Sequence, residues 1–192
     1  MAVVAGIDPS LTNCGIAILA NGQPRYLDAI GHPGKDGASY DNRSDRIVSQ
    51  ARTIIRAVLE DYDAPDDQTI RRHIDLAVIE GPAYAHANAY THDGAGLWWG
   101  LYSALRAKRI PTVVIAPKTR ARWAIGNGNA GKKDVLAAVR TWWPNHTIRN
   151  HDIADALVLA AIGAHRAGDP MPFPVKDRHT LALDAISWPA IA

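Results

Sequence analysis

Two short apolar runs of the sequence each end in a single carboxylate. Residues 3–7 are followed by Asp8, and residues 74–79 are followed by Glu80. Pro9 comes directly after the first carboxylate and cannot donate a ladder hydrogen bond. Burying a charge without a partner is costly, so packing alone does not explain an acidic residue at the tip of a buried strand. The simpler alternative is that Asp8 caps a turn through its side chain.

A second acidic pair opens the last apolar stretch that has helical spacing. Asp152 and Asp155 are three residues apart, which places both side chains on one face of a helix. The plain interpretation is a favourable interaction with the helix macrodipole, worth about 0.3–1 kcal/mol for each residue. If the pair shares one site with the two strand-end carboxylates, however, the four groups repel one another and raise one another's pKa.

Divalent cations relieve such repulsion, and they bring a defined chemistry with them. Mg²⁺ prefers a few carboxylates together with water and phosphate oxygens. Two such ions about 3.5–4 Å apart clamp the attacking and leaving oxygens of a phosphodiester. The four carboxylates therefore indicate metal-dependent phosphodiester chemistry, provided that the fold brings them together.

The order of the expected elements favours that convergence. Strands are expected over 2–8, 14–20, 25–30, 74–79 and 111–116, and helices over 42–60, 93–109, 118–125, 132–143 and 150–167. Asn21-Gly22 is a strong hairpin signal, so the first three strands form an antiparallel meander. A strand that follows a helix usually runs parallel to the earlier strand. If the Glu80 strand lies beside the Asp8 strand, both carboxylates reach the sheet edge where open α/β sheets bind ligands.

The expected fold class is therefore α/β, with a five-stranded mixed sheet flanked by helices. Residues 61–72 are expected to form a charged loop, and Asp93 is expected to cap the helix that begins there. The length of 192 residues suits one domain, which we place at 1–168. Residues 169–192 are rich in proline and lack periodicity, so we expect an irregular C-terminal tail.

Composition limits the possible classes of protein. The net charge of +2 is too small to establish a polyanion partner by itself. Cys14 is the only cysteine, which excludes an internal disulfide. No apolar run approaches the roughly 20 residues that a bilayer span needs, and no secretory signal precedes the first strand. We therefore expect a cytoplasmic protein without a membrane partner.

Basic residues follow the last expected strand, close to the predicted acidic edge. They are Lys118, Arg120, Arg122, Lys132 and Lys133. Phosphate contacts from such side chains position DNA without reading its sequence. The alternative is that they are ordinary surface charges. His151 has similar alternatives, as a ligand or proton shuttle or as a solvent-facing residue at a helix start.

Four segments, in this order, resemble the RuvC family of Holliday junction resolvases, which has a ribonuclease-H-like fold. The segments are Gly6-Ile7-Asp8-Pro9-Ser10 with Gly15, the strand that ends in Glu80, Gly126-x-Gly128-x-Ala130-x-Lys132, and Asp152-x-x-Asp155-Ala156-Leu157. The resemblance implies that Asp8, Glu80, Asp152 and Asp155 are catalytic carboxylates that bind metal, and that Lys132 lies near the scissile phosphate. It also implies a homodimer, with the helix after the Glu80 strand at the interface; Gly96, Trp98, Trp99 and Gly100 lie on that helix. For Trp98 and Trp99, core packing is the alternative.

The sequence departs from the family pattern at two positions. The family has an aromatic residue three positions after the glutamate, where this chain has Ala83, and Tyr84 follows one position later. We expect Tyr84 to contact DNA in its place. A family lysine falls at Ala121, between Arg120 and Arg122, whose charge can replace it.

The function implied by the resemblance is a dimeric endonuclease that depends on Mg²⁺, with Mn²⁺ as a substitute. It would cut four-way DNA junctions by paired symmetric nicks and leave 5′ phosphates and 3′ hydroxyls. Three alternatives remain open: a ribonuclease-H-like nuclease for flaps, forks or RNA–DNA hybrids, a junction-binding protein without catalysis, and an ATPase related to sugar kinases and actin. The ATPase would need a second lobe, for which the chain is too short.

Overall fold

A five-stranded mixed sheet lies at the centre of the computed structural model, which describes residues 2–61, 70–71, 73–82, 89–184 and 186–190. Its strands are β1 (Val3–Asp8), β2 (Cys14–Ala20), β3 (Gln23–Ile30), β6 (Leu76–Glu80) and β7 (Thr112–Ile115). They are arranged in the order β3-β2-β1-β6-β7. The pairs among β1, β2 and β3 are antiparallel, whereas β1, β6 and β7 run parallel. The expected meander and the expected parallel strands are both confirmed.

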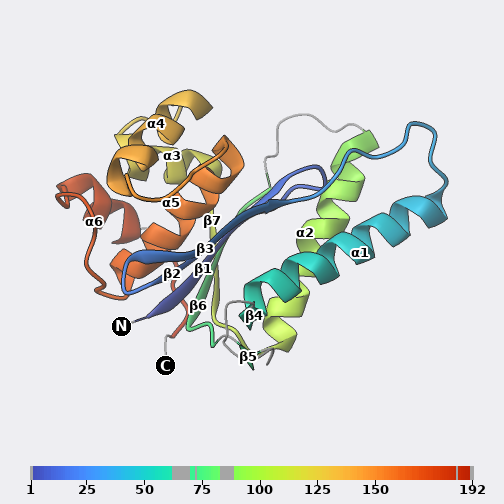
Figure 1. The fold of residues 1–192 in the computed structure, drawn as a ribbon, viewed down its shortest axis with the longest axis horizontal. Helices are drawn as coiled ribbons and strands as arrows, with labels where there is room; N and C mark the ends of the chain where they lie inside the picture. The colour runs from blue at the N-terminus through green and yellow to red at the C-terminus, as the bar shows by residue number, and fades with distance from the viewer. Residues whose placement is uncertain (1, 62–69, 72, 83–88, 185, 191–192) are drawn as a thin grey trace.

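Helices cover both faces of this sheet (Figure 1). The helices are α1 (Tyr40–Leu59), α2 (Ala89–Ala107), α3 (Pro117–Ile125), α4 (Lys132–Trp142), α5 (His151–Arg166) and α6 (Asp177–Asp184). Figure 1 shows α1 and α2 on one face, and α3 to α6 on the other. The fold is thus a three-layer α/β arrangement with the sheet in the middle.

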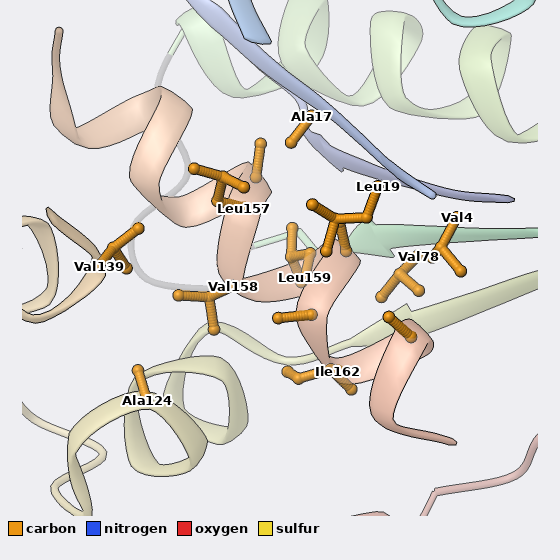
Figure 2. Close-up of a cluster of buried hydrophobic side chains, with 14 of the residues drawn as sticks. Val4, Ala17, Leu19, Val78, Ala124, Val139, Leu157, Val158, Leu159 and Ile162 are labelled. Carbon is orange, nitrogen blue, oxygen red and sulfur yellow. The ribbon is translucent and has the colours of Figure 1, made fainter. Parts of the chain in front are cut away.

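Alternation along the central strands supplies both halves of the core. Val4 and Val78 face the side of α5, whereas Ala5 and Ile79 face the side of α1 and α2. Helix α5 is buried from residue 152 to residue 164, as expected for a helix that is apolar all round. Figure 2 shows its side chains packed against residues of the sheet and of α3 and α4.

The register of the parallel strands determines where the carboxylates lie. Ile7 of β1 is paired with Ile79 of β6. The next residues along the two strands are Asp8 and Glu80, so both reach the same edge of the sheet. The sequence prediction that the two strand-end carboxylates share an edge is confirmed at the level of the backbone.

Three expectations about local structure are wrong. Within the stretch expected as a charged loop, β4 (Glu60–Asp61) pairs with β5 (Ile70–Arg71) as a short antiparallel ladder. Helix α2 begins at Ala89, so Asp93 lies inside the helix, where its carboxylate accepts hydrogen bonds from Arg43 Nε at 2.9 Å and Nη2 at 2.6 Å. The C-terminal segment is not irregular throughout, because it contains α6.

None of the helices within the described ranges is both long enough and apolar enough to cross a membrane.

Candidate active site

Two glycines allow the start of α5 to lie directly on the sheet. A Cβ atom at Gly6 would lie 2.0 Å from the carbonyl oxygen of Ala156, and one at Gly15 would lie 2.0 Å from that of Asp152. No side chain larger than hydrogen fits at such distances. Asn150 caps the helix by accepting a hydrogen bond from Ile153 N at 3.0 Å. The first turn of α5 is therefore held close to the end of β1.

This packing brings the four predicted carboxylates into one electrostatic cluster. Burial raises the pKa of Asp8 well above its usual range, and the charges of Glu80, Asp155 and Asp152 raise it further. Burial also raises the pKa of Asp155 to about 6, with a further contribution from Glu80. The interpretation of Asp8 as a simple turn cap does not account for this grouping of like charges.

Asp152 has its own set of partners at the rim of the cluster. Its Oδ2 accepts a hydrogen bond from the side-chain amide of Asn13, in the turn between β1 and β2. Its Oδ1 lies 2.8 Å from His151 Nδ1. In turn, Lys132 Nζ, at the start of α4, lies 3.4 Å from the same His151 nitrogen. These contacts connect Lys132 to the acidic cluster through His151.

Arg120 lies within the acidic cluster. Only 8% of it is exposed. Its Nε donates to Glu80 Oε2, and its Nη1 donates to Asp155 Oδ1. Burial lowers the pKa of Arg120, but the neighbouring charges of Glu80 and Asp155 outweigh this effect and raise it. The sequence placed Arg120 among surface residues that contact DNA, whereas the structure places it between two carboxylates.

The donor chemistry of the cluster suits a hard divalent cation. All four acidic groups offer oxygen ligands. Burial and then repulsion by the other carboxylates raise the pKa of Asp8, and a bound cation would relieve the repulsion. In the arrangement described, with Arg120 between Glu80 and Asp155, no three His, Cys, Asp or Glu side chains of the described residues form a group that could hold a metal ion. The residue types therefore suit a metal ion. The Arg120 guanidinium, however, occupies the position where Glu80 and Asp155 would bind that ion.

The other predicted DNA contacts lie at the surface nearby. Lys118, Arg122, Lys132 and Lys133 are exposed and belong to α3 and α4. The glycine-rich loop between these helices packs against α3, because a Cβ atom at Gly128 would lie 3.0 Å from the carbonyl oxygen of Lys118. Tyr84 lies outside the described residues.

The two adjacent tryptophans of α2 have different environments. Trp98 is buried and donates from Nε1 to the carbonyl oxygen of Glu80 at 2.8 Å, which anchors α2 to the end of β6. Trp99 is 61% exposed. Core packing is therefore right for Trp98 and wrong for Trp99.

Sequence reasoning missed two contributors to the site. Asn13 gave no signal, because its contact with Asp152 joins residues 139 positions apart. The pairing of Arg120 was also missed, because α3 could be predicted from the sequence but the direction of its side chains toward the sheet could not. The only sequence signal for a role of Arg120 was the departure from the family pattern at the next residue, Ala121.

No family model matches the chain, but its curated relatives share one name. The chain is 30% identical over 184 residues to the crossover junction endodeoxyribonuclease RuvC of Mycobacterium ulcerans, covering 93% of this chain and 91% of the relative. It is also 30% identical over 189 residues to the protein of the same name from Bifidobacterium longum, covering 94% and 88% of the two chains.

Solved structures show the same fold. Thermus thermophilus RuvC superposes with a TM-score of 0.61 at 18% identity, over 89% of this chain and 99% of that chain. T. thermophilus RuvC in complex with a Holliday junction substrate gives a TM-score of 0.60 at 17% identity, over 90% and 100% of the two chains.

Proposed function

The chain belongs to the RuvC family of crossover junction endodeoxyribonucleases, and we propose that it resolves Holliday junctions by paired, symmetric nicks. The observation that carries the proposal is the grouping of four carboxylates from β1, β6 and α5 at one sheet edge, with exposed lysines and arginines on the adjoining helices.

We propose that Asp8, Glu80, Asp152 and Asp155 are the ligands of Mg²⁺, for which Mn²⁺ substitutes. When bound, divalent cations supply a nucleophilic water at neutral pH and stabilise the leaving 3′ oxygen. Asn13 and His151 orient the Asp152 carboxylate, since each contacts one of its oxygens. Products would carry a 5′ phosphate and a 3′ hydroxyl.

The basic residues around the cluster would hold the DNA backbone. Lys132 lies 3.4 Å from His151, which in turn contacts Asp152, and we assign it to the scissile phosphate. Lys118, Arg122 and Lys133 are exposed on the same side of the sheet, on α3 and α4, and we assign them to flanking phosphates. Tyr84 remains a prediction for the junction contact.

Two sites in one assembly are needed for paired nicks, and we propose a homodimer through α1 and α2. A hollow between these helices is lined mainly by apolar residues and also by two arginines: Ile47, Val48, Ala51, Ile55, Gly96, Gly100 and Ala104, with Arg52 and Arg56. Exposed Trp99 lies on the same helix as the two glycines. An apolar surface with an exposed tryptophan is typical of a protein–protein interface.

A panel of DNA substrates tests the proposal. The full chain is incubated with a synthetic four-way junction, a flap, a fork, an RNA–DNA hybrid and a matched linear duplex, in Mg²⁺, Mn²⁺ or EDTA. We expect symmetric nicks in two opposing strands of the junction, only with a divalent cation, and little cutting of the duplex. On a supercoiled plasmid with a cruciform, linear product without a nicked intermediate indicates two active sites in one complex.

Two other results would change the assignment. Faster cutting of flaps, forks or hybrids would keep the site but assign it to another ribonuclease-H-like nuclease. Tight junction binding without cleavage in any metal would favour a non-catalytic junction-binding protein.

A further inference from the structure

A buried arginine occupies the place where the proposed function requires a metal. Arg120 is 8% exposed and joins β6 to α5 by pairing with Glu80 and Asp155. Arg122, two residues along the same helix, is exposed. The pairing is therefore a property of position 120 and not of the basic character of α3 in general.

The shape and charge of the guanidinium suit this place. It presents several N–H donors in a fixed plane, so one side chain can donate to two carboxylates at once. The carboxylates need such a partner, because leaving them buried and unpaired is costly. With Arg120 between them, Glu80 and Asp155 are held together although both carry negative charge.

A divalent cation on the same carboxylates would compete with Arg120. Glu80 Oε2 and Asp155 Oδ1 accept hydrogen bonds from the guanidinium. A cation bound to these oxygens would lie within a few ångströms of a positive charge that is buried with it, where repulsion is strong. In this arrangement the guanidinium, and not a cation, is the partner of both oxygens.

We propose that Arg120 is an internal counter-ion of the metal-free site, and that it must release Glu80 and Asp155 before a divalent cation binds there. The inference rests on the proposed nuclease function. Arg120 is thus a positioning residue that keeps the carboxylates assembled until the metal replaces it.

Metal binding by the DNA-free chain tests the proposal without using activity. Isothermal titration calorimetry with Mn²⁺ is carried out on the wild type, on Arg120→Gln and on Arg122→Gln. We expect Arg120→Gln to bind Mn²⁺ at least about tenfold more tightly than the wild type, because the competing charge is gone. Arg122→Gln removes the same charge from an exposed position on the same helix, so its affinity should stay close to that of the wild type.

Two further measurements guard against a variant that changes the fold. Circular dichroism verifies that Arg120→Gln is folded. Without metal, the melting temperature of the variant should fall below that of the wild type. Mn²⁺ should raise the melting temperature of the variant by more than it raises that of the wild type. In the wild type itself, the ¹⁵N–¹H signal of Arg120 Nε should shift as diamagnetic Mg²⁺ is added. The Asp155→Asn variant should lose this shift.

The outcomes separate this inference from the proposed function. Equal or weaker Mn²⁺ binding by Arg120→Gln, or an Arg120 signal that saturating Mg²⁺ leaves unchanged, overturns the role of Arg120 even if the wild type cuts junctions. Tighter binding by Arg120→Gln in a protein that cuts no junction supports the role of Arg120 and removes the resolvase assignment.

Discussion

At the scale of single residues, Asp8 combines a proposed function with a cost in stability. Its pKa is raised by burial and then by the charges of Glu80 and Asp155. A group with a raised pKa holds its proton more tightly in the folded chain than in the unfolded chain. Its ionisation therefore destabilises the fold as the pH rises above the unfolded value of 3.8.

We expect Asp8→Asn to stabilise the metal-free protein at pH 7.5 by about 0.5–2 kcal/mol, while it abolishes junction cleavage. Urea unfolding measures the first effect and the junction assay the second. The gain should shrink as the pH falls toward 3.8 and vanish below that value, where the carboxyl is protonated in both states. The exposed Asp36→Asn is the control and should change the free energy of unfolding by less than about 0.5 kcal/mol. If Asp8→Asn is instead less stable than the wild type at neutral pH, favourable contacts of the Asp8 carboxylate outweigh its repulsion by the neighbouring carboxylates.

The sequence predicted which carboxylates lie together better than it predicted their partners. Asp8 and Glu80 could be placed together because each ends an apolar run, and strand register carries that information across the sheet. The contacts of Arg120 and Asn13 depend on side-chain directions and on long-range packing. Nothing in the local sequence encodes either of these.

At the scale of elements, the contact between α5 and the meander sets the geometry of the site. The helix carries Asp152 and Asp155, and the glycines of β1 and β2 let its backbone touch the strands. This close approach means that a single methyl group in the wrong place moves two of the four carboxylates relative to the other two.

We expect Gly15→Ala to destabilise the protein by about 1–3 kcal/mol, because its Cβ would lie 2.0 Å from the carbonyl oxygen of Asp152. Urea unfolding measures this loss, and calorimetry with Mn²⁺ should show weaker binding. Gly94→Ala is the matched control. Apart from its chain neighbours and the nearby backbone of its own helix, no heavy atom lies within 4 Å of a Cβ atom at Gly94. Alanine in a helix is favoured over glycine, so that change should be neutral or stabilising. Equal effects of the two changes would contradict the close approach.

The elements that the sequence predicted are those with a strong hydrophobic signal. The central strands and helix α5 were found because packing on both sides makes each of them a nearly continuous apolar run. The β4–β5 ladder was missed because each strand has only two residues. The start of α2 was misplaced because Asp93 resembles a cap but pairs instead with Arg43 of α1.

At the scale of the whole molecule, the C-terminal segment is joined to the helix that carries Arg120. Trp123 of α3 donates from Nε1 to the carbonyl oxygen of His179 at 3.2 Å. Arg178 donates back to the carbonyl oxygens of Trp123 at 3.2 Å and of Ala124 at 3.1 Å. Phe173 packs against the rings of Trp123 and His179.

Prolines interrupt the periodicity of this segment, so the sequence did not indicate its helix. The division into a domain at 1–168 and a tail at 169–192 remains a proposal.

His179 makes the docking of that segment sensitive to acid. The residue is 1% exposed, and its Nδ1 accepts a hydrogen bond from Lys176 N at 3.0 Å. Burial, with a smaller contribution from the charge of Arg178, lowers its pKa from 6.5 to about 4. Between these two values the unfolded chain binds more protons than the folded chain, so stability rises with pH and is lost on acidification.

We expect His179→Asn to remove this dependence, because the amide oxygen can still accept the hydrogen bond but does not titrate. Relative to the variant, the wild type should lose about 3 kcal/mol of unfolding free energy between pH 7 and pH 4, as measured by urea unfolding. Titration of Asp8 and Asp155 changes the stability in the opposite direction in this window, but both residues are common to the two proteins, so the difference reports His179 alone.

The exposed His92→Asn should follow the wild-type curve. If wild type and His179→Asn give parallel curves from pH 7 to pH 4, the histidine is not buried in solution, and the segment from Lys176 onward is not docked on α3.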